Sequence, residues 1–124
     1  MNAQAENLEA KPPLTPIREE VLRDAIIAAI EGYDLTESDA WNQLDELSSH
    51  TMVEGVEPNP DGIFKKGTNE FEAVGTVYVT LTYGDKKDNA SMNDSYPIQI
   101  RGKFEDDNEI TVSSVEVDTS SFYE

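Results

Sequence analysis

The stretch Phe71-Glu-Ala-Val-Gly-Thr-Val-Tyr-Val-Thr-Leu-Thr-Tyr83 alternates between apolar and polar residues, and this pattern decides the fold class. A period of two is typical of a β-strand with one buried face, because successive side chains of a strand point to opposite sides. The apolar face would carry Phe71, Ala73, Val77, Val79, Leu81 and Tyr83, and the polar face Glu72, Thr76, Tyr78, Thr80 and Thr82. The sequence therefore predicts a long strand that covers a core on one side.

Further strands are expected around this one. Alternation over 96–104 predicts a second strand, and residues 110–117 predict a third, with a phase change at Ser113-Ser114 that indicates a β-bulge. Segments 52–56 and 63–66 are weaker candidates for an added hairpin or an edge strand. On the polar face of the second strand, Arg101 is expected to pair across the sheet with Glu72 or Glu116.

The first fifty residues have a helical period instead. Thr15-Pro16 is typical of a helix N-terminus, an apolar stripe at helical spacing follows, and Gly32 predicts the end of the helix near residue 31. A second, shorter helix is expected from Thr36 to about Ser49. Residues 1–14 would form a flexible arm and residues 15–124 a single domain.

Since the expected strands follow the helices instead of alternating with them, the sheet should be antiparallel. The predicted fold class is α+β, with two N-terminal helices packed on one face of an antiparallel sheet of three to five strands.

The charge of the chain is its most unusual property. It has 26 Asp and Glu against 9 Lys and Arg, a formal net charge of -17 over 124 residues. A compact domain of this size is roughly 35 Å across, a length over which duplex DNA carries about 20 phosphate charges. Such a surface favours basic sites on other proteins and disfavours direct contact with nucleic acid or with anionic membranes.

Several kinds of catalytic or cofactor site are not indicated. The chain has no cysteine and no glycine-rich phosphate loop, and no flanking motif makes the single histidine, His50, part of a catalytic triad. The polar loop 84–95 lacks the spacing of a calcium loop and has Lys86-Lys87 at its centre. We therefore expect no enzyme activity, no metal and no cofactor. With no signal segment and no long apolar run, the sequence predicts a cytoplasmic protein.

Our first functional hypothesis is a non-enzymatic protein that binds a basic site on a partner protein, with a DNA-mimicking inhibitor from a phage or mobile element as its most specific form. The acidic residues expected to form the binding ridge are Glu70, Glu72, Asp94, Glu105, Asp106, Asp107, Glu109, Glu116 and Asp118.

The alternative hypothesis is an accessory or adaptor module whose acidity serves only solubility. In that case the partner would be bound by aromatic residues, namely Tyr78 on the polar strand face and Phe122 and Tyr123 near the C-terminus. The sequence leaves the oligomeric state and the identity of the partner open.

Overall fold

The computed structural model describes residues 14–85, 87–105 and 109–123. These residues form one antiparallel sheet of five strands in the order β1-β2-β3-β4-β5, with every neighbouring pair consecutive in the sequence. The elements in chain order are β1 (Leu14–Pro16), α2 (Glu20–Glu31), the 3₁₀ turn η1 (Leu35–Glu37), α3 (Ala40–Asp45), β2 (His50–Lys66), β3 (Glu70–Gly84), β4 (Asn89–Phe104), β5 (Ile110–Val117) and the 3₁₀ turn η2 (Ser120–Tyr123).

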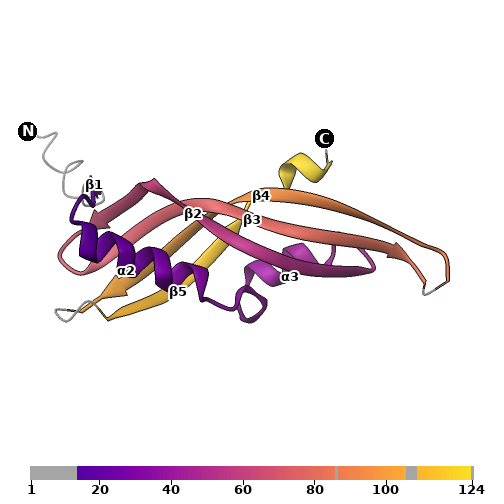
Figure 1. Cartoon of the computed structure of the whole chain (residues 1–124), viewed down its shortest axis with the longest axis horizontal. Helices are drawn as coiled ribbons and strands as arrows, with labels where there is room; N and C mark the ends of the chain where they lie inside the picture. The colour runs from indigo at the N-terminus through magenta and orange to yellow at the C-terminus, as the bar shows by residue number, and fades with distance from the viewer. Residues whose placement is uncertain (1–13, 86, 106–108, 124) are drawn as a thin grey trace, which may run out of the picture.

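Three long strands dominate the molecule. Figure 1 shows β2, β3 and β4 as long curved ribbons, with the β3–β4 hairpin extending beyond α2 and α3 at one end. In this hairpin the pairing is regular from Glu70 opposite Lys103 to Gly84 opposite Asn89. The predicted alternation of β3 is confirmed, because Phe71, Ala73, Val77, Val79 and Leu81 are all buried.

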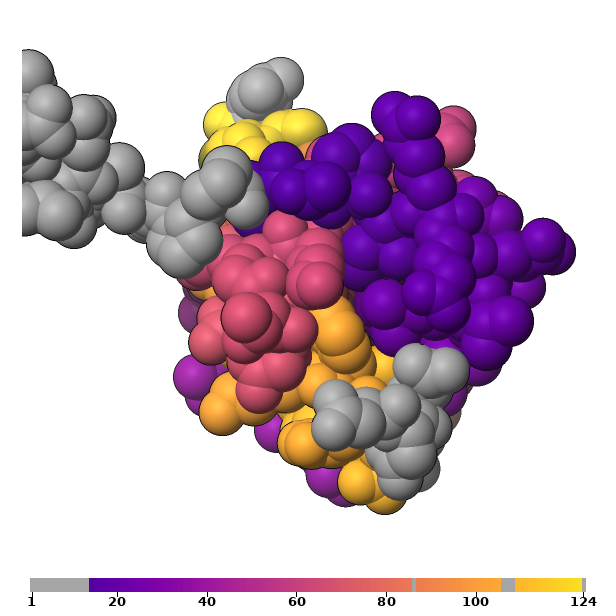
Figure 2. Space-filling view, turned by 90° about the vertical axis from the view of Figure 1, so that its left-hand side faces the viewer, coloured from indigo at the N-terminus to yellow at the C-terminus, as the bar shows by residue number. Residues whose placement is uncertain are grey.

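The core lies between this apolar sheet face and the helices. Leu22, Ile26 and Ile30 are four residues apart, so they share the face of α2 that is buried. This helix contacts both β2 and β5, strands that are not neighbours in the sheet, so the curved sheet partly encloses it. Figure 2 shows the residues of α2, in indigo, packed beside the end of the sheet.

The predicted two-helix layer is wrong, because most of the described residues belong to the sheet and α2 is the only helix among them that is longer than six residues. Its expected first turn is not helical, since Thr15 and Pro16 pair with Lys65 and Phe64 as β1. The backbone N–H of Ile17 then donates to the carbonyl of Ile63, 2.9 Å away. The backbone of residues 15–17 is therefore bonded to β2, so these residues do not form the first turn of a helix.

The expected helix over 36–49 is reduced to η1 and the six-residue α3. The Asp34 carboxylate accepts a hydrogen bond from the backbone N–H of Thr36, and the Ser38 hydroxyl donates to the Leu35 carbonyl. Such local bonds between side chains and backbone compete with continuous helix. Beyond α3, the buried Thr51 hydroxyl donates to the Leu44 carbonyl and ties the start of β2 to the helix end.

The strand predictions fared differently from one another. The bulge expected in the last strand is confirmed: Arg101 pairs with Ser114 and Gly102 with Val112, so Ser113 is left between them. Segments 52–56 and 63–66 are not a hairpin but two parts of β2, interrupted by irregular pairing between Val53 and Gly55 and between Pro58 and Ile63.

The flexible arm predicted for residues 1–14 lies outside the described residues, apart from Leu14, which belongs to β1. No helix in the described part of the chain is long and apolar enough to cross a membrane.

Candidate functional site

The polar face of the sheet, opposite the core, carries a cluster of charged side chains at the end where β2 meets β3. We call Lys66, Glu72, Gln99, Arg101 and Glu116 the Glu72 cluster. Its members come from four adjacent strands, because Glu72 is on β3, Lys66 on β2, Gln99 and Arg101 on β4, and Glu116 on β5. Glu72 lies directly opposite Arg101, and Gln99 directly opposite Glu116.

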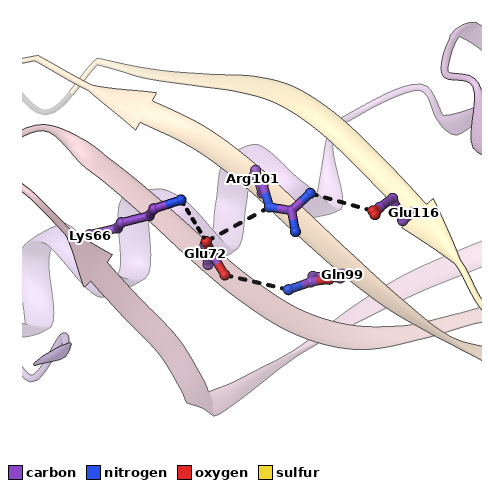
Figure 3. Close-up of polar contacts among 5 residues, drawn as sticks. All are labelled: Lys66, Glu72, Gln99, Arg101 and Glu116. Atoms are coloured by element: carbon purple, nitrogen blue, oxygen red, sulfur yellow. Dashed lines mark hydrogen bonds and ion pairs between the residues drawn. The ribbon is translucent and has the colours of Figure 1, made fainter. Parts of the chain in front are cut away.

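Glu72 is the centre of the cluster (Figure 3). Its Oε2 lies 3.2 Å from Lys66 Nζ and 3.7 Å from Arg101 Nε. Its other oxygen, Oε1, accepts a hydrogen bond of 3.4 Å from the Gln99 amide. Arg101 Nη1 is 3.4 Å from Glu116 Oε2 and donates to it, so one guanidinium joins two carboxylates.

Burial within the cluster differs between its members. The side chain of Glu72 is 14% exposed and that of Lys66 is 23% exposed, whereas Arg101 and Glu116 are 40% and 55% exposed. A carboxylate that has lost most of its water needs cations and donors around it, and Glu72 has both. Because two cations face two carboxylates, the cluster is formally neutral on a protein of net charge -17.

The basic residues of the chain gather at this end. Of the seven Lys and Arg residues in the described part, only Lys87 lies in the distant β3–β4 turn. Lys65 and Lys103 flank the Glu72 cluster on β2 and β4, and Arg18 and Arg23 line a cavity with Ile63 of β2. A polyanion would therefore meet most of the described basic residues of the chain here.

The predicted acidic residues do not form one ridge. Glu72 and Glu116 join the cluster, whereas Asp94 lies opposite Val79, seven residues or about 23 Å further along β3. Asp94 Oδ2 instead accepts a hydrogen bond of 2.8 Å from the phenol of Tyr96. At the end of β5, hydrogen bonds from Ser120 lower the pKa of the Asp118 carboxyl.

The other predicted acidic residues lie at strand ends or outside the described part. Glu70 begins β3 and faces Lys66 and Lys103 in the register. The backbone N–H of Glu105 donates to the carbonyl of Glu109 across the β4–β5 turn. Asp106 and Asp107 lie outside the described residues.

The three predicted aromatic residues have different surroundings. Tyr78 is exposed on the polar face and donates to Glu57, and this bond and the charge of Glu57 raise the pKa of the phenol. Phe122 packs against the core, and the exposed Tyr123 meets its ring edge-on at a centroid distance of 5.2 Å. Their role in partner binding stays a prediction.

Metal binding would have few ligands. Within residues 14–85, 87–105 and 109–123, no group of three or more His, Asp or Glu side chains is placed to hold a metal ion together. In the Glu72 cluster, the Arg101 guanidinium lies between the carboxylates of Glu72 and Glu116, so these two groups do not face one shared cation site (Figure 3).

The family of the chain follows from comparison with known sequences. Residues 17–123 match the model of a family described as "Predicted pPIWI-associating nuclease", and the chain belongs to this family. No curated protein and no solved structure matches the chain. The matched range includes every member of the Glu72 cluster and the strands β2 to β5, and it begins directly after β1.

This membership corrects the functional hypotheses from the sequence. A family described as a nuclease points to enzyme activity. Both functional hypotheses are therefore wrong: the non-enzymatic DNA-mimicking inhibitor, and the accessory or adaptor module whose acidity serves only solubility. They failed because net charge reports the average surface, whereas a reaction depends on a few local groups. The expected association with a partner protein agrees with the family description, which says nothing about a basic surface on that partner.

Two members of the Glu72 cluster, Lys66 and Gln99, were not predicted from the sequence. The pairing of Arg101 with Glu72 and Glu116 was expected and is confirmed. Lys66 was not expected there, because two irregular stretches of β2 separate it from the regular start of the strand. The doublet Lys65-Lys66 opposite an acidic strand start was the available signal.

Proposed function

We propose that this chain hydrolyses phosphodiester bonds of nucleic acid in association with a pPIWI protein, and that the Glu72 cluster receives the scissile phosphate. Membership of the family over residues 17–123 supports the reaction class. The observation that carries the site is the carboxylate of Glu72, largely shielded from water and held between Lys66 and Arg101 on an otherwise open sheet face.

Each group has a role in this proposal. Lys66 and Arg101 bind the non-bridging phosphate oxygens, for which the forked guanidinium is well suited. Glu72, released from one of its cations when the phosphate binds, accepts a proton from the attacking water. The water oxygen bonds to phosphorus and one ester P–O bond breaks, so the products are a phosphate monoester and an alcohol that takes up a proton from solvent.

Substrate must reach this site despite the charge of the protein. Six of the seven described basic residues lie at the same end as the cluster, namely Arg18, Arg23, Lys65, Lys66, Arg101 and Lys103. The pPIWI partner supplies a further surface for the nucleic acid in this arrangement.

The test is cleavage of labelled single-stranded DNA, duplex DNA and single-stranded RNA by the chain together with its pPIWI protein, with MgCl₂ and with EDTA. We expect Glu72→Gln to reduce cleavage at least about 100-fold, the usual scale for loss of a general base. Glu37→Gln is the matched control, because Glu37 is exposed on η1, away from the polar sheet face.

Two results would overturn the proposal. One is full cleavage by a folded Glu72→Gln variant, which would move the reaction to another site. The other is a wild-type complex that cleaves none of the three substrates under any of these conditions.

A further inference from the structure

The strand β2 has one side that is open over half its length. Along β3 it is paired from His50 opposite Thr82 to Lys66 opposite Glu70. On its other side, the only strand in the described part is β1, which covers just Phe64–Lys66. Residues 50–58 therefore form a sheet edge, and an unpaired edge can accept another strand through its backbone N–H and C=O groups.

A groove of about 480 Å³ follows this edge. One wall is made by every residue from His50 to Val56, and the other by the segment Tyr33–Thr36 together with Glu31 and Trp41. Alternate residues of a strand point to opposite faces, so a groove that touches seven consecutive residues runs along the strand edge and not over one face. At Gly55 there is open space, since an added Cβ would meet no atom within 4 Å.

The lining of the groove specifies the chemistry of what it binds. Tyr33, Trp41, Val53 and Val56 are half-buried and pack against the core, so they form an apolar floor. The charged lining residues are all acidic, namely Glu31, Asp34 and Glu54, and all three are exposed. An occupant with apolar side chains on one face and Lys or Arg at the margins would match this groove.

A second copy of this chain matches it poorly. Two β2 edges placed side by side would bring their Glu54 and Glu57 carboxylates together, in molecules that each carry a net charge of -17. Like charges on adjacent strands destabilise pairing. The chain's own β1 leads away from this edge, because its next residue, Ile17, bonds to Ile63 and the chain then enters α2.

We infer that the edge of β2 over His50–Val56 binds an extended, cationic segment of the partner protein as an added β-strand. This inference rests on the partner association in the proposed function and locates the partner's binding site at the β2 edge. The groove is separate from the Glu72 cluster, with which it shares no residue. Cleavage can therefore be disabled at Glu72 without loss of partner binding.

The first experiment is hydrogen exchange of the full chain with and without the purified pPIWI protein of the same organism. An added strand should slow amide exchange in residues 50–56 by at least about tenfold, because its carbonyls bond the N–H groups of the edge. Slowed exchange confined to another surface, such as β5, would overturn the inference.

The second experiment compares two triple variants that each remove three negative charges. Glu31→Gln, Asp34→Asn and Glu54→Gln keep the side-chain shapes and the acceptors for Thr36 and Thr80 but neutralise the groove. The control set also removes three negative charges, but at exposed positions that do not line the groove, namely Glu20→Gln, Asp88→Asn and Glu105→Gln. We expect the affinity for the pPIWI protein to fall at least about tenfold for the first set only. Equal affinities of the two sets would contradict the inference.

Failure of this inference differs from failure of the proposed function. Glu72→Gln should leave the affinity for the pPIWI protein unchanged while cleavage is lost. If the partner binds elsewhere but cleavage still depends on Glu72, only the docking site is wrong. If residues 50–56 are protected but no substrate is cleaved, the docking site stands and the nuclease proposal fails.

Discussion

The ring of Phe71 on β3 fills the space beside Gly102 on β4 where a side chain would otherwise lie. The two residues are directly opposite in the register, and Phe71 is 1% exposed. A Cβ built at Gly102 would be 2.5 Å from Phe71 Cε2 and 2.6 Å from Cζ, and it would also collide with the Thr111 carbonyl oxygen. The glycine thus permits a large buried ring at the end of the sheet that carries the Glu72 cluster.

Gly102→Ala should therefore lower the free energy of unfolding by about 1–3 kcal/mol, the usual cost of overpacking a core. Gly55→Ala is the control, because its Cβ would meet no atom within 4 Å, and we expect a change within about 0.5 kcal/mol. Urea unfolding of both variants measures the difference. Equal stabilities would mean that Phe71 can move aside freely.

Ile26 of α2 tests how strongly the helix is tied to the sheet. Its side chain is fully buried, so Ile26→Ala should destabilise the fold by about 2–5 kcal/mol. Val21 is on the same helix but 64% exposed, and Val21→Ala should change the stability little. Thermal unfolding followed by circular dichroism would compare them. A small effect of Ile26→Ala would show that α2 contributes little to the core.

The titration of Tyr96 should make the free energy of unfolding fall at alkaline pH. Burial raises the pKa of this phenol well above its usual value of about 10, and the hydrogen bond to Asp94 and the Asp94 charge raise it further. The folded state then keeps a proton that the unfolded state loses, so this stabilisation is complete below pH of about 10 and declines as the pH rises above it.

Tyr96→Phe removes this pH dependence and should cost about 1 kcal/mol at neutral pH through the lost hydrogen bond. Urea unfolding of both proteins across the alkaline range is the measurement. If the two stability curves stay parallel as the pH rises, Tyr96 does not carry the effect.

Salt should stabilise the protein. The net charge of -17 makes the compact state repel itself, and the screening length falls from about 10 Å at 0.1 M to about 3 Å at 1 M salt. We expect the melting temperature to rise with added KCl over this range. Neutralised variants such as the groove triple should show a smaller rise. A melting temperature that falls with salt would indicate that ion pairs like those of the Glu72 cluster outweigh the repulsion.

The sequence by itself determined the long strand over 71–83, because its alternation is a local property that any sheet packing on one face must respect. It also determined the bulge at Ser113, where the apolar phase changes, and the pairing of Arg101 with acidic neighbours. The cytoplasmic location of the protein stays a prediction. These successes share one cause: each depends on residues that are close in sequence or in directly adjacent regular strands.

Only the tertiary structure decided the rest. Whether Thr15-Pro16 begins a helix or pairs as β1 depends on β2, whose matching residues lie about fifty positions later. The continuity of β2 through Pro58 and Gly62 depends on β3 pairing on both sides of that interruption. The Glu72 cluster needs four strands in one register, and register is set by packing over the whole sheet, which no local pattern contains.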